Sequence, residues 1–191
     1  MPSMNRLATW ILFAAFLLGA EIARGDVTSG PIAGSVPTPL VTHVVVGEPV
    51  DKEIDLIAHR AKKPTVIVLI PTEKWNRPTA RFLKALDTGL KEVEEGRVCA
   101  VWLTADHAAA REYLPKAQMS LQFERTDLGD FTGEAAGPPE WGINGEADIT
   151  VVALRDGKVV KTWGFVSIND TVAREVLQTV QKPAENPPGT K

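Results

Sequence analysis

The side chains able to do chemistry in this chain of 191 residues are few and far apart. The single cysteine, Cys99, lies inside the apolar run Val-Cys-Ala-Val-Trp-Leu, residues 98–103. A cysteine in a buried strand is usually an inert, small hydrophobic residue with a raised pKa, and a reactive thiol is the alternative interpretation. Because the chain has one cysteine, no disulfide bond can form within it.

Other residues of the types that bind metals or catalyse reactions form no recognised pattern. Asp106, His107 and Glu112 lack the spacing of any zinc motif, so we expect a solvated start of a helix there and no metal or other cofactor. His43 and His59 stand apart from any nucleophile, and the sequence contains neither a Gly-x-Ser-x-Gly turn nor a phosphate-binding loop.

The polar turn Trp-Asn-Arg-Pro-Thr, residues 75–79, follows an apolar run over residues 65–70. Such a run predicts a strand covered on both faces, and open α/β folds place their sites at the carboxyl ends of these strands. Trp75 could contact a peptide or pack over the strand end. Arg77 could bind an anion at a helix start or remain solvated. Asn76 and Thr79 are both suitable helix caps.

The hydrophobic periodicity predicts an alternating α/β order. We expect strands over residues 42–46, 65–70, 98–103, 149–154 and 159–163, the last two joined by an Asp-Gly hairpin turn, with a short extra strand over 121–124. We expect helices over residues 51–61, from Pro78 to near Gly96, from 108 to 114 where Pro115 disturbs the pattern, and after a cap at Asn169 or Asp170. Residues 129–139 are predicted to be a loop.

The turn at residues 75–79 resembles the Trp-Cys-Gly-Pro-Cys active-site turn of the thioredoxin superfamily, with both cysteines replaced. Trp141-Gly142-Ile143 resembles the Tyr-Gly-Ile/Val of that family, and residues 149–159 align with its Pro-Thr-strand-Asn/Asp-Gly-Lys/Glu-Val segment. The additional helix and strand before Trp141 look like the peroxiredoxin and TlpA-like redoxin branch. The resemblance implies a thioredoxin-like α/β fold, a three-layer α/β/α sandwich with a central mixed sheet, over residues 42–181.

The departures from the family pattern bear on activity. Asn76 and Thr79 occupy the two cysteine positions, and an amide and a hydroxyl group cannot exchange disulfides. The peroxiredoxin pattern Pro-x-x-x-Thr-x-x-Cys is absent. Ile149 occupies the position of the family's cis-proline, and we expect a trans peptide bond before it because a cis bond before a residue other than proline costs about 3 kcal/mol.

Composition bounds the class of protein. With 44% hydrophobic and 24% charged residues, the chain is typical of one globular domain, and a net charge of -3 argues against a nucleic-acid partner. Arg6 precedes an uncharged apolar segment, residues 7–20, which predicts a signal peptide over residues 1–25, cleaved at Ala23-Arg24-Gly25 or Leu18-Gly19-Ala20. An uncleaved signal anchor is the alternative. Residues 26–41 are predicted to be a flexible leader and residues 182–191 a disordered tail.

The sequence therefore predicts a protein exported to the periplasm or the extracellular space, without stable membrane insertion after cleavage. We expect a non-catalytic module that binds an exported protein or peptide. The candidate binding residues are Trp75, Asn76, Arg77, Pro78, Thr79, Trp141, Ile149 and Thr150. The alternative is a thiol-disulfide oxidoreductase or antioxidant redoxin that acts through Cys99, and a third interpretation is a structural element of an envelope complex. The sequence does not specify the partner or the oligomeric state.

Overall fold

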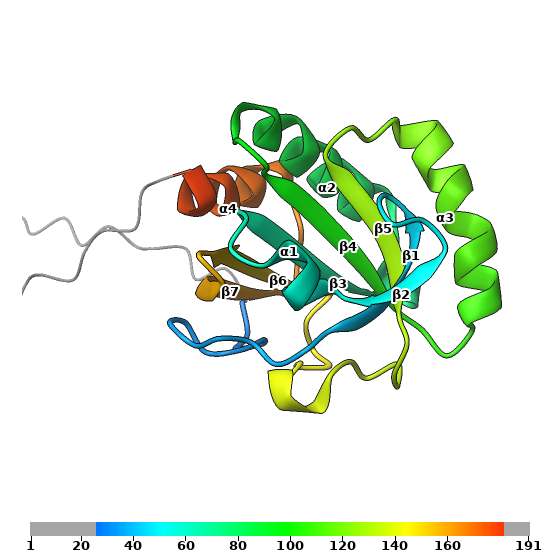
Figure 1. Ribbon diagram of the computed structural model, residues 1–191, viewed down its shortest axis with the longest axis horizontal. Coiled ribbons are helices and arrows are strands. Elements are labelled where there is room, and N and C mark those ends of the chain that lie inside the picture. The colour runs from blue at the N-terminus through cyan, green and yellow to red at the C-terminus, as the bar shows by residue number, and fades with distance from the viewer. Residues whose placement is uncertain (1–25, 182–191) are drawn as a thin grey trace, which may run out of the picture.

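The computed structural model describes residues 26–181, and its centre is a seven-stranded sheet in the order β2-β1-β5-β4-β3-β6-β7 (Figure 1). The strands are β1 (Val41–Val46), β2 (Lys52–Asp55), β3 (Thr65–Pro71), β4 (Arg97–Leu103), β5 (Thr126–Phe131), β6 (Ile149–Arg155) and β7 (Lys158–Phe165). β3, β4 and β5 run parallel to one another, and all the other neighbours pair antiparallel. The sheet is therefore mixed, as expected.

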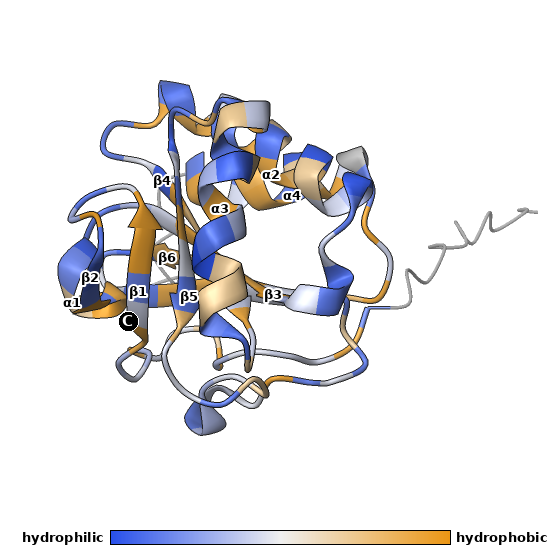
Figure 2. Cartoon of the chain, turned by 90° about the vertical axis from the view of Figure 1, so that its right-hand side faces the viewer, coloured by the Kyte–Doolittle hydropathy of each residue, from blue (hydrophilic) through white to orange (hydrophobic). Residues whose placement is uncertain are grey.

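Helices cover both faces of the sheet. They are α1 (Leu56–Arg60), α2 (Arg77–Gly89), α3 (His107–Leu121) and α4 (Asp170–Gln181), with short 3-10 helices η1 (Thr72–Lys74), η2 (Leu90–Glu92) and η3 (Pro139–Trp141). The cores beneath them are separate: α2, α3 and α4 pack on one face, and α1, Leu40 and Trp141 pack on the other. Figure 2 shows hydrophobic residues on the strands and hydrophilic residues along much of α3. The architecture is the predicted three-layer sandwich.

β3 has the two-sided burial that its sequence predicts. Val66, Val68 and Ile70 point into the core beneath α2 and α4, whereas Ile67 and Leu69 point into the opposite core. All five side chains are fully buried. Because burying one such side chain contributes about 1.5–3 kcal/mol, this strand anchors both layers and fixes the position of the turn that follows it.

α2 begins where the sequence predicts and ends earlier. The side chain of Asn76 accepts a hydrogen bond from the backbone N–H of Thr79, and Pro78 occupies the first turn. The helix stops at Gly89 and tightens into η2 instead of continuing to near Gly96. A Cβ atom at Gly89 would lie 2.3 Å from Leu177 of α4, so the glycine is there because the two helices pack closely.

The predicted end of α3 at Pro115 is wrong, and so is the short strand predicted over residues 121–124. The helix continues through Pro115 to Leu121, and Gln122 closes it in the left-handed conformation. Pro115 lies on the exposed side of the helix, where water can hydrogen-bond the carbonyl group that a proline leaves without a partner. Exposure therefore lowers the cost of the proline enough for the packed helix to persist.

β5 was assigned in part to a loop, and that prediction is also wrong. Its residues Asp127, Gly129 and Asp130 do not read as a strand. The structure gives two of them a reason: a Cβ atom at Gly129 would lie 2.5 Å from the carbonyl oxygen of His43 in β1, and the buried Asp130 receives hydrogen bonds from α3. Tertiary contacts therefore specify this strand.

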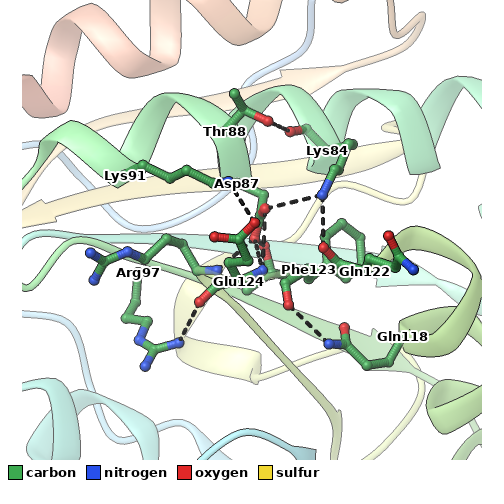
Figure 3. A network of polar contacts seen from close by, with 11 residues as sticks. Lys84, Asp87, Thr88, Lys91, Arg97, Gln118, Gln122, Phe123 and Glu124 are labelled. Carbon is green, nitrogen blue, oxygen red and sulfur yellow. Dashed lines mark hydrogen bonds and ion pairs between the residues drawn. The ribbon is translucent and has the colours of Figure 1, made fainter.

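Asp87 in α2 fastens the connection between α3 and β5 (Figure 3). Its fully buried carboxylate accepts hydrogen bonds from the backbone N–H groups of Glu124 and Arg125, and from the hydroxyl group of Thr126. The ammonium group of Lys84 lies 3.5 Å from the same carboxylate and donates to the carbonyl oxygen of Gln122. One carboxylate thus accepts hydrogen bonds from three donors in or next to a connection that has no regular secondary structure.

The segment at residues 51–61 is not a continuous helix. It starts as β2, which pairs with β1, and only then turns into α1. Asp55 marks the change, because its carboxylate accepts hydrogen bonds from the backbone N–H groups of Ile57 and Leu40. The pairing with β1 overrides the helical pattern in this segment.

The prediction that residues 26–41 form a flexible leader is wrong, because these residues pack along the domain. Val27 bridges to Gly164, the backbone of Gly34 and Ser35 hydrogen-bonds Val159 in the edge strand β7, and Leu40 is fully buried. Covering an edge strand removes a surface on which other chains could pair. The predicted signal peptide, residues 1–25, and tail, residues 182–191, lie outside the described residues. Within residues 26–181 no helix is both long and apolar enough to cross a membrane.

Candidate functional site

The turn at residues 75–79 is closed by its own side chains. The hydroxyl group of Thr79 is buried, and its single proton is shared between the carbonyl oxygen of Lys74, at 3.0 Å, and the side-chain oxygen of Asn76, at 3.1 Å. Asn76 in turn caps α2. The two residues at the cysteine positions of the resemblance therefore bind each other and the backbone, which is a structural role.

Trp75 in this turn belongs to an aromatic cluster. Its indole ring lies 5.4 Å from the ring of Trp102 at the end of β4, and the ring of Trp102 stacks on Tyr113 of α3 at 5.5 Å. The indole N–H of Trp75 donates a hydrogen bond of 3.1 Å to the hydroxyl oxygen of Tyr113. Aromatic contacts of this kind add about 0.5–1.5 kcal/mol beyond area burial, so the cluster holds the turn against α3.

Two hollows flank this cluster, and we call them together the aromatic groove. One, of about 440 Å³, lies towards Arg77 and Leu121, and the other, of about 540 Å³, lies towards Trp102 and Asp106. They share Trp75, Tyr113 and Lys116 as lining residues. The groove therefore lies between the start of α2 and the length of α3, at the carboxyl ends of β3 and β4.

Trp102, at the end of β4, has a buried indole N–H group that lacks a hydrogen-bond acceptor in the described part of the chain. Its side chain is only 4% exposed and lines the larger hollow, yet its indole N–H has no hydrogen-bond acceptor among residues 26–181. Leaving a buried donor without an acceptor costs about 1–3 kcal/mol. The nitrogen itself is covered by protein atoms, so this donor is a structural cost of packing Trp102 at the end of β4.

The second half of the predicted binding surface is buried. Trp141 is 1% exposed, its indole N–H donates to the hydroxyl group of Thr38 at 3.1 Å, and the hydroxyl group of Thr150 hydrogen-bonds Ser29. Ile149 is fully buried. The predictions that these residues and Thr79 contact a partner are corrected, because all four are buried. Residues 27–40 cover Trp141 and Thr150, whereas Ile149 packs into the core beneath α2 and α4, and Thr79 is enclosed by its own turn. Asn76, Arg77 and Pro78 are exposed, and Trp75 is half-buried.

The turn and the start of β6 nevertheless lie together, as the resemblance implies. The ammonium group of Lys74 is 2.7 Å from a carboxylate oxygen of Asp148, the residue before Ile149. Within residues 26–181 the only cis peptide bond joins Glu48 and Pro49, so the bond before Ile149 is trans, as expected. The ion pair occupies the region between the turn and β6.

Cys99 points away from the aromatic groove, into the opposite core. Its side chain is 2% exposed, and the pKa of the thiol is raised to about 12, first by burial and then by the nearby carboxylate of Asp127. A thiol in this state holds its proton and is neither an attacking nor a metal-binding group. The geometry supports the inert interpretation of Cys99 and gives the reactive one no support.

The residues of metal-ligand type do not converge. His107 hydrogen-bonds Asp130 at 2.8 Å, Asp106 caps α3, and Glu112 pairs with Lys116 at 2.7 Å. Within residues 26–181 no group of three or more such side chains could hold a metal ion. Sequence reasoning did not identify Trp102, Tyr113 and Lys116 as residues of the groove, although Trp102 ends a predicted strand and is therefore at the expected edge.

No protein-family model matches the chain, and no curated protein matches it by sequence. Solved structures do match. A candidate protein disulfide isomerase from Bacteroides thetaiotaomicron is 12% identical, over 82% of this chain and 96% of that one, with a TM-score of 0.57. A DsbF homologue from Corynebacterium diphtheriae is 11% identical, over 84% and 96%, with a TM-score of 0.55.

A secreted thiol-disulfide isomerase from Corynebacterium glutamicum is 12% identical, over 76% of this chain and 85% of that one, with a TM-score of 0.52. Sequence identities this low indicate a shared fold and say nothing about activity. The sheet order, the helices on both faces and these likenesses lead to the same result. The chain has a thioredoxin-like fold of the kind found in redoxins, and it has one cysteine, buried away from the turn.

Proposed function

We propose that this protein is an exported, non-catalytic binding module that holds an extended segment of another exported polypeptide in the aromatic groove. The observation that carries the proposal is the aromatic cluster itself: Trp75, Trp102 and Tyr113 line one hollow at the carboxyl ends of β3 and β4. Large aromatic side chains that line a hollow are the residue type that most often anchors a bound peptide.

The lining of the groove also suits a peptide. Trp75 and Tyr113 offer rigid aromatic faces with polar rims, the residue types that dominate peptide and protein recognition. Their rings are already held by Trp102 and by their mutual hydrogen bond. Because these side chains are ordered before binding, they lose little conformational entropy on contact. Arg77 adds positive charge at the rim of the smaller hollow, which favours an acidic residue in the bound segment there, whereas the charge of Lys116 is paired with Glu112.

The absence of redox chemistry at the turn supports binding without catalysis. Asn76 and Thr79 are committed to closing the turn, and Cys99 lies on the other side of the sheet. The thiol alternative requires Cys99 to reach a substrate, and its burial and raised pKa oppose this. Export is supported by the apolar segment at residues 7–20 and by the secreted protein among the structural neighbours.

A peptide-display selection on the purified protein tests the proposal. Selected peptides should bind with a measurable Kd, and Trp75→Ala should weaken them by about 30-fold, the effect of losing a hot-spot residue of about 2 kcal/mol. Met119→Ala is the matched control, because Met119 is a large exposed apolar residue of α3 that does not line the groove. Equal losses in both variants, or insulin reduction at the rate of a genuine thioredoxin, would contradict the proposal.

A further inference from the structure

A second pocket lies at the amino ends of β3, β4 and β5, whereas the aromatic groove lies at the carboxyl ends of β3 and β4. It has a volume of about 370 Å³, and we call it the basic pocket. Its lining residues come from α1, from the connection between β1 and β2, and from the starts of β3, β4 and β5 and the residues just before them. They are the basic residues His59, Arg60, Lys63, Arg97 and Arg125, and the acidic residues Glu48, Glu95 and Asp127. Nothing in the proposed peptide-binding function uses this pocket.

Arg60 is the central observation, because its largely buried charge has no carboxylate of residues 26–181 within ion-pair distance, although Glu95 and Asp127 lie near enough to interact with it electrostatically. The side chain is 8% exposed, and it donates to the hydroxyl oxygen of Thr65 and to the carbonyl oxygens of Pro64 and Glu95, at 3.0, 3.4 and 2.6 Å. All three acceptors are neutral, and within residues 26–181 the remaining nitrogen, Nη1, has no acceptor. Buried charges in proteins are normally paired, and an anion that reached Nη1 from the pocket would supply the ion pair that Arg60 lacks.

The other charges leave the pocket with a positive excess. Lys63 pairs with Glu95 at 2.7 Å, and Arg97 pairs with Asp127 at 3.4 Å, so these four largely cancel. Arg125 makes no side-chain hydrogen bond or ion pair with any residue in 26–181, and it lines the same pocket as Arg60. Two arginines with free donors therefore line one hollow, and Glu48 is the one lining carboxylate that no described lysine or arginine pairs within ion-pair distance.

We propose that the basic pocket binds the phosphate group of a small phosphomonoester that also carries hydroxyl groups. Arginine is the preferred partner of phosphate because its planar donors match two oxygens at once. A volume of about 370 Å³ lies at the lower end of the range for small-molecule sites. The carboxylates of Glu48 and Asp127, which would repel a bare anion, are acceptors for the hydroxyl groups of such a ligand.

Calorimetric titration of the full chain with inorganic phosphate, glycerol 3-phosphate and glycerol tests the assignment. Saturable binding of glycerol 3-phosphate is expected, tighter than that of inorganic phosphate, with none for glycerol. Arg125→Gln should weaken glycerol 3-phosphate by about tenfold or more, because a charged hydrogen bond contributes roughly 1.5–3 kcal/mol. Arg60→Gln should do the same, with folding checked by its thermal unfolding.

Arg81→Gln is the matched control, since Arg81 is an exposed residue of α2 outside the pocket and its loss changes the net charge equally. Retained affinity in this variant supports a localised site. Three results would each overturn the proposal: no saturable binding of either phosphate compound, equal weakening by Arg81→Gln and Arg125→Gln, or inorganic phosphate binding as tightly as glycerol 3-phosphate. Because Arg125→Gln removes no contact of the fold, the test does not depend on the stability of the Arg60 variant.

Discussion

The indole N–H of Trp75 and the hydroxyl oxygen of Tyr113 lie 3.1 Å apart and join the turn after β3 to the middle of α3. The bond spans the boundary between the two hollows of the aromatic groove. Beneath it, Trp102 contacts both rings. The position of Trp75, which the proposed function treats as the main anchor, therefore depends on a helix that comes much later in the chain.

Tyr113→Phe should loosen Trp75 without dismantling the cluster. The variant keeps the ring that stacks on Trp102 and removes only the acceptor, so we expect a stability loss of about 0.5–1.5 kcal/mol or less and a weaker affinity for selected peptides. The indole N–H resonance of Trp75, assigned with a Trp75→Phe variant, reports the change directly. An unshifted resonance with unchanged affinity would show that the bond does not position Trp75.

Cys99 should react with a thiol reagent only after unfolding. Its pKa of about 12 and its burial predict no labelling of the native protein at pH 8, and one thiol per chain in denaturant. Labelling of the native protein at the rate of a free thiol would instead support the alternative, a thiol-disulfide oxidoreductase that acts through Cys99. Cys99→Ala provides the blank for both measurements.

The same raised pKa predicts a pH dependence of stability. The thiol ionises near its ordinary value of 9.0 in the unfolded chain and only near 12 in the folded protein, so the unfolded state loses its proton first. The contribution of Cys99 to stability is therefore complete below pH 9 and falls above it, by up to about 1.4 kcal/mol per pH unit. In denaturant titrations between pH 8 and pH 10, stability should fall less steeply for Cys99→Ala than for the natural chain.

Those parts of the fold that depend on local sequence were predictable. β3 and β4 follow from uninterrupted apolar runs, the β6–β7 hairpin follows from Asp156-Gly157, and the start of α2 follows from Asn76 and Pro78. In each case the signal and the structure lie within a few residues of each other. The thioredoxin-like topology could be inferred from these elements together with the resemblance.

The parts that failed depend on distant contacts. Asp130 makes β5 look like a loop in the sequence, because the residues that hydrogen-bond its carboxylate, His107 and Arg111, lie in α3. Trp141 was expected at the surface, and the segment that covers it, which includes Thr38, has the composition of a linker. The aromatic groove was half predicted for the same reason: Trp75 stands in a recognisable turn, whereas Tyr113 reaches it only through the packing of α3.

Asp87→Ala should be among the most damaging substitutions outside the apolar core. It leaves the backbone N–H groups of Glu124 and Arg125 and the hydroxyl group of Thr126 without their acceptor (Figure 3). We expect a loss of about 3–5 kcal/mol in urea unfolding, as for other buried charged networks broken on one side. Thr88→Ala, one residue away on the exposed side of α2, is the control and should cost far less. A loss below about 1 kcal/mol for Asp87→Ala would show that water replaces the carboxylate.

Asp127→Asn should stabilise the protein at neutral pH. Burial raises the pKa of Asp127 above its ordinary value, and the positive charge of Arg97 only partly opposes this. A raised pKa means that the folded state disfavours the ionised form, so ionisation costs stability at pH 7 and costs nothing below the ordinary value of 3.8. The gain from Asp127→Asn should therefore be largest at pH 7 and shrink as the pH falls towards 4.

Urea unfolding of both proteins at pH 7, 5.5, 4.5 and below 3.8 measures this gain, with Glu146→Gln as an exposed control that removes the same charge. If Asp127→Asn were less stable than the natural chain at pH 7, the ion pair with Arg97 would outweigh the cost of burying the carboxylate. The sign of the change at pH 7 therefore decides between desolvation and pairing as the dominant effect on Asp127. A gain that stays constant from pH 7 to below the ordinary value of 3.8 would exclude both, because neither effect persists once the carboxylate is protonated in both the folded and the unfolded state.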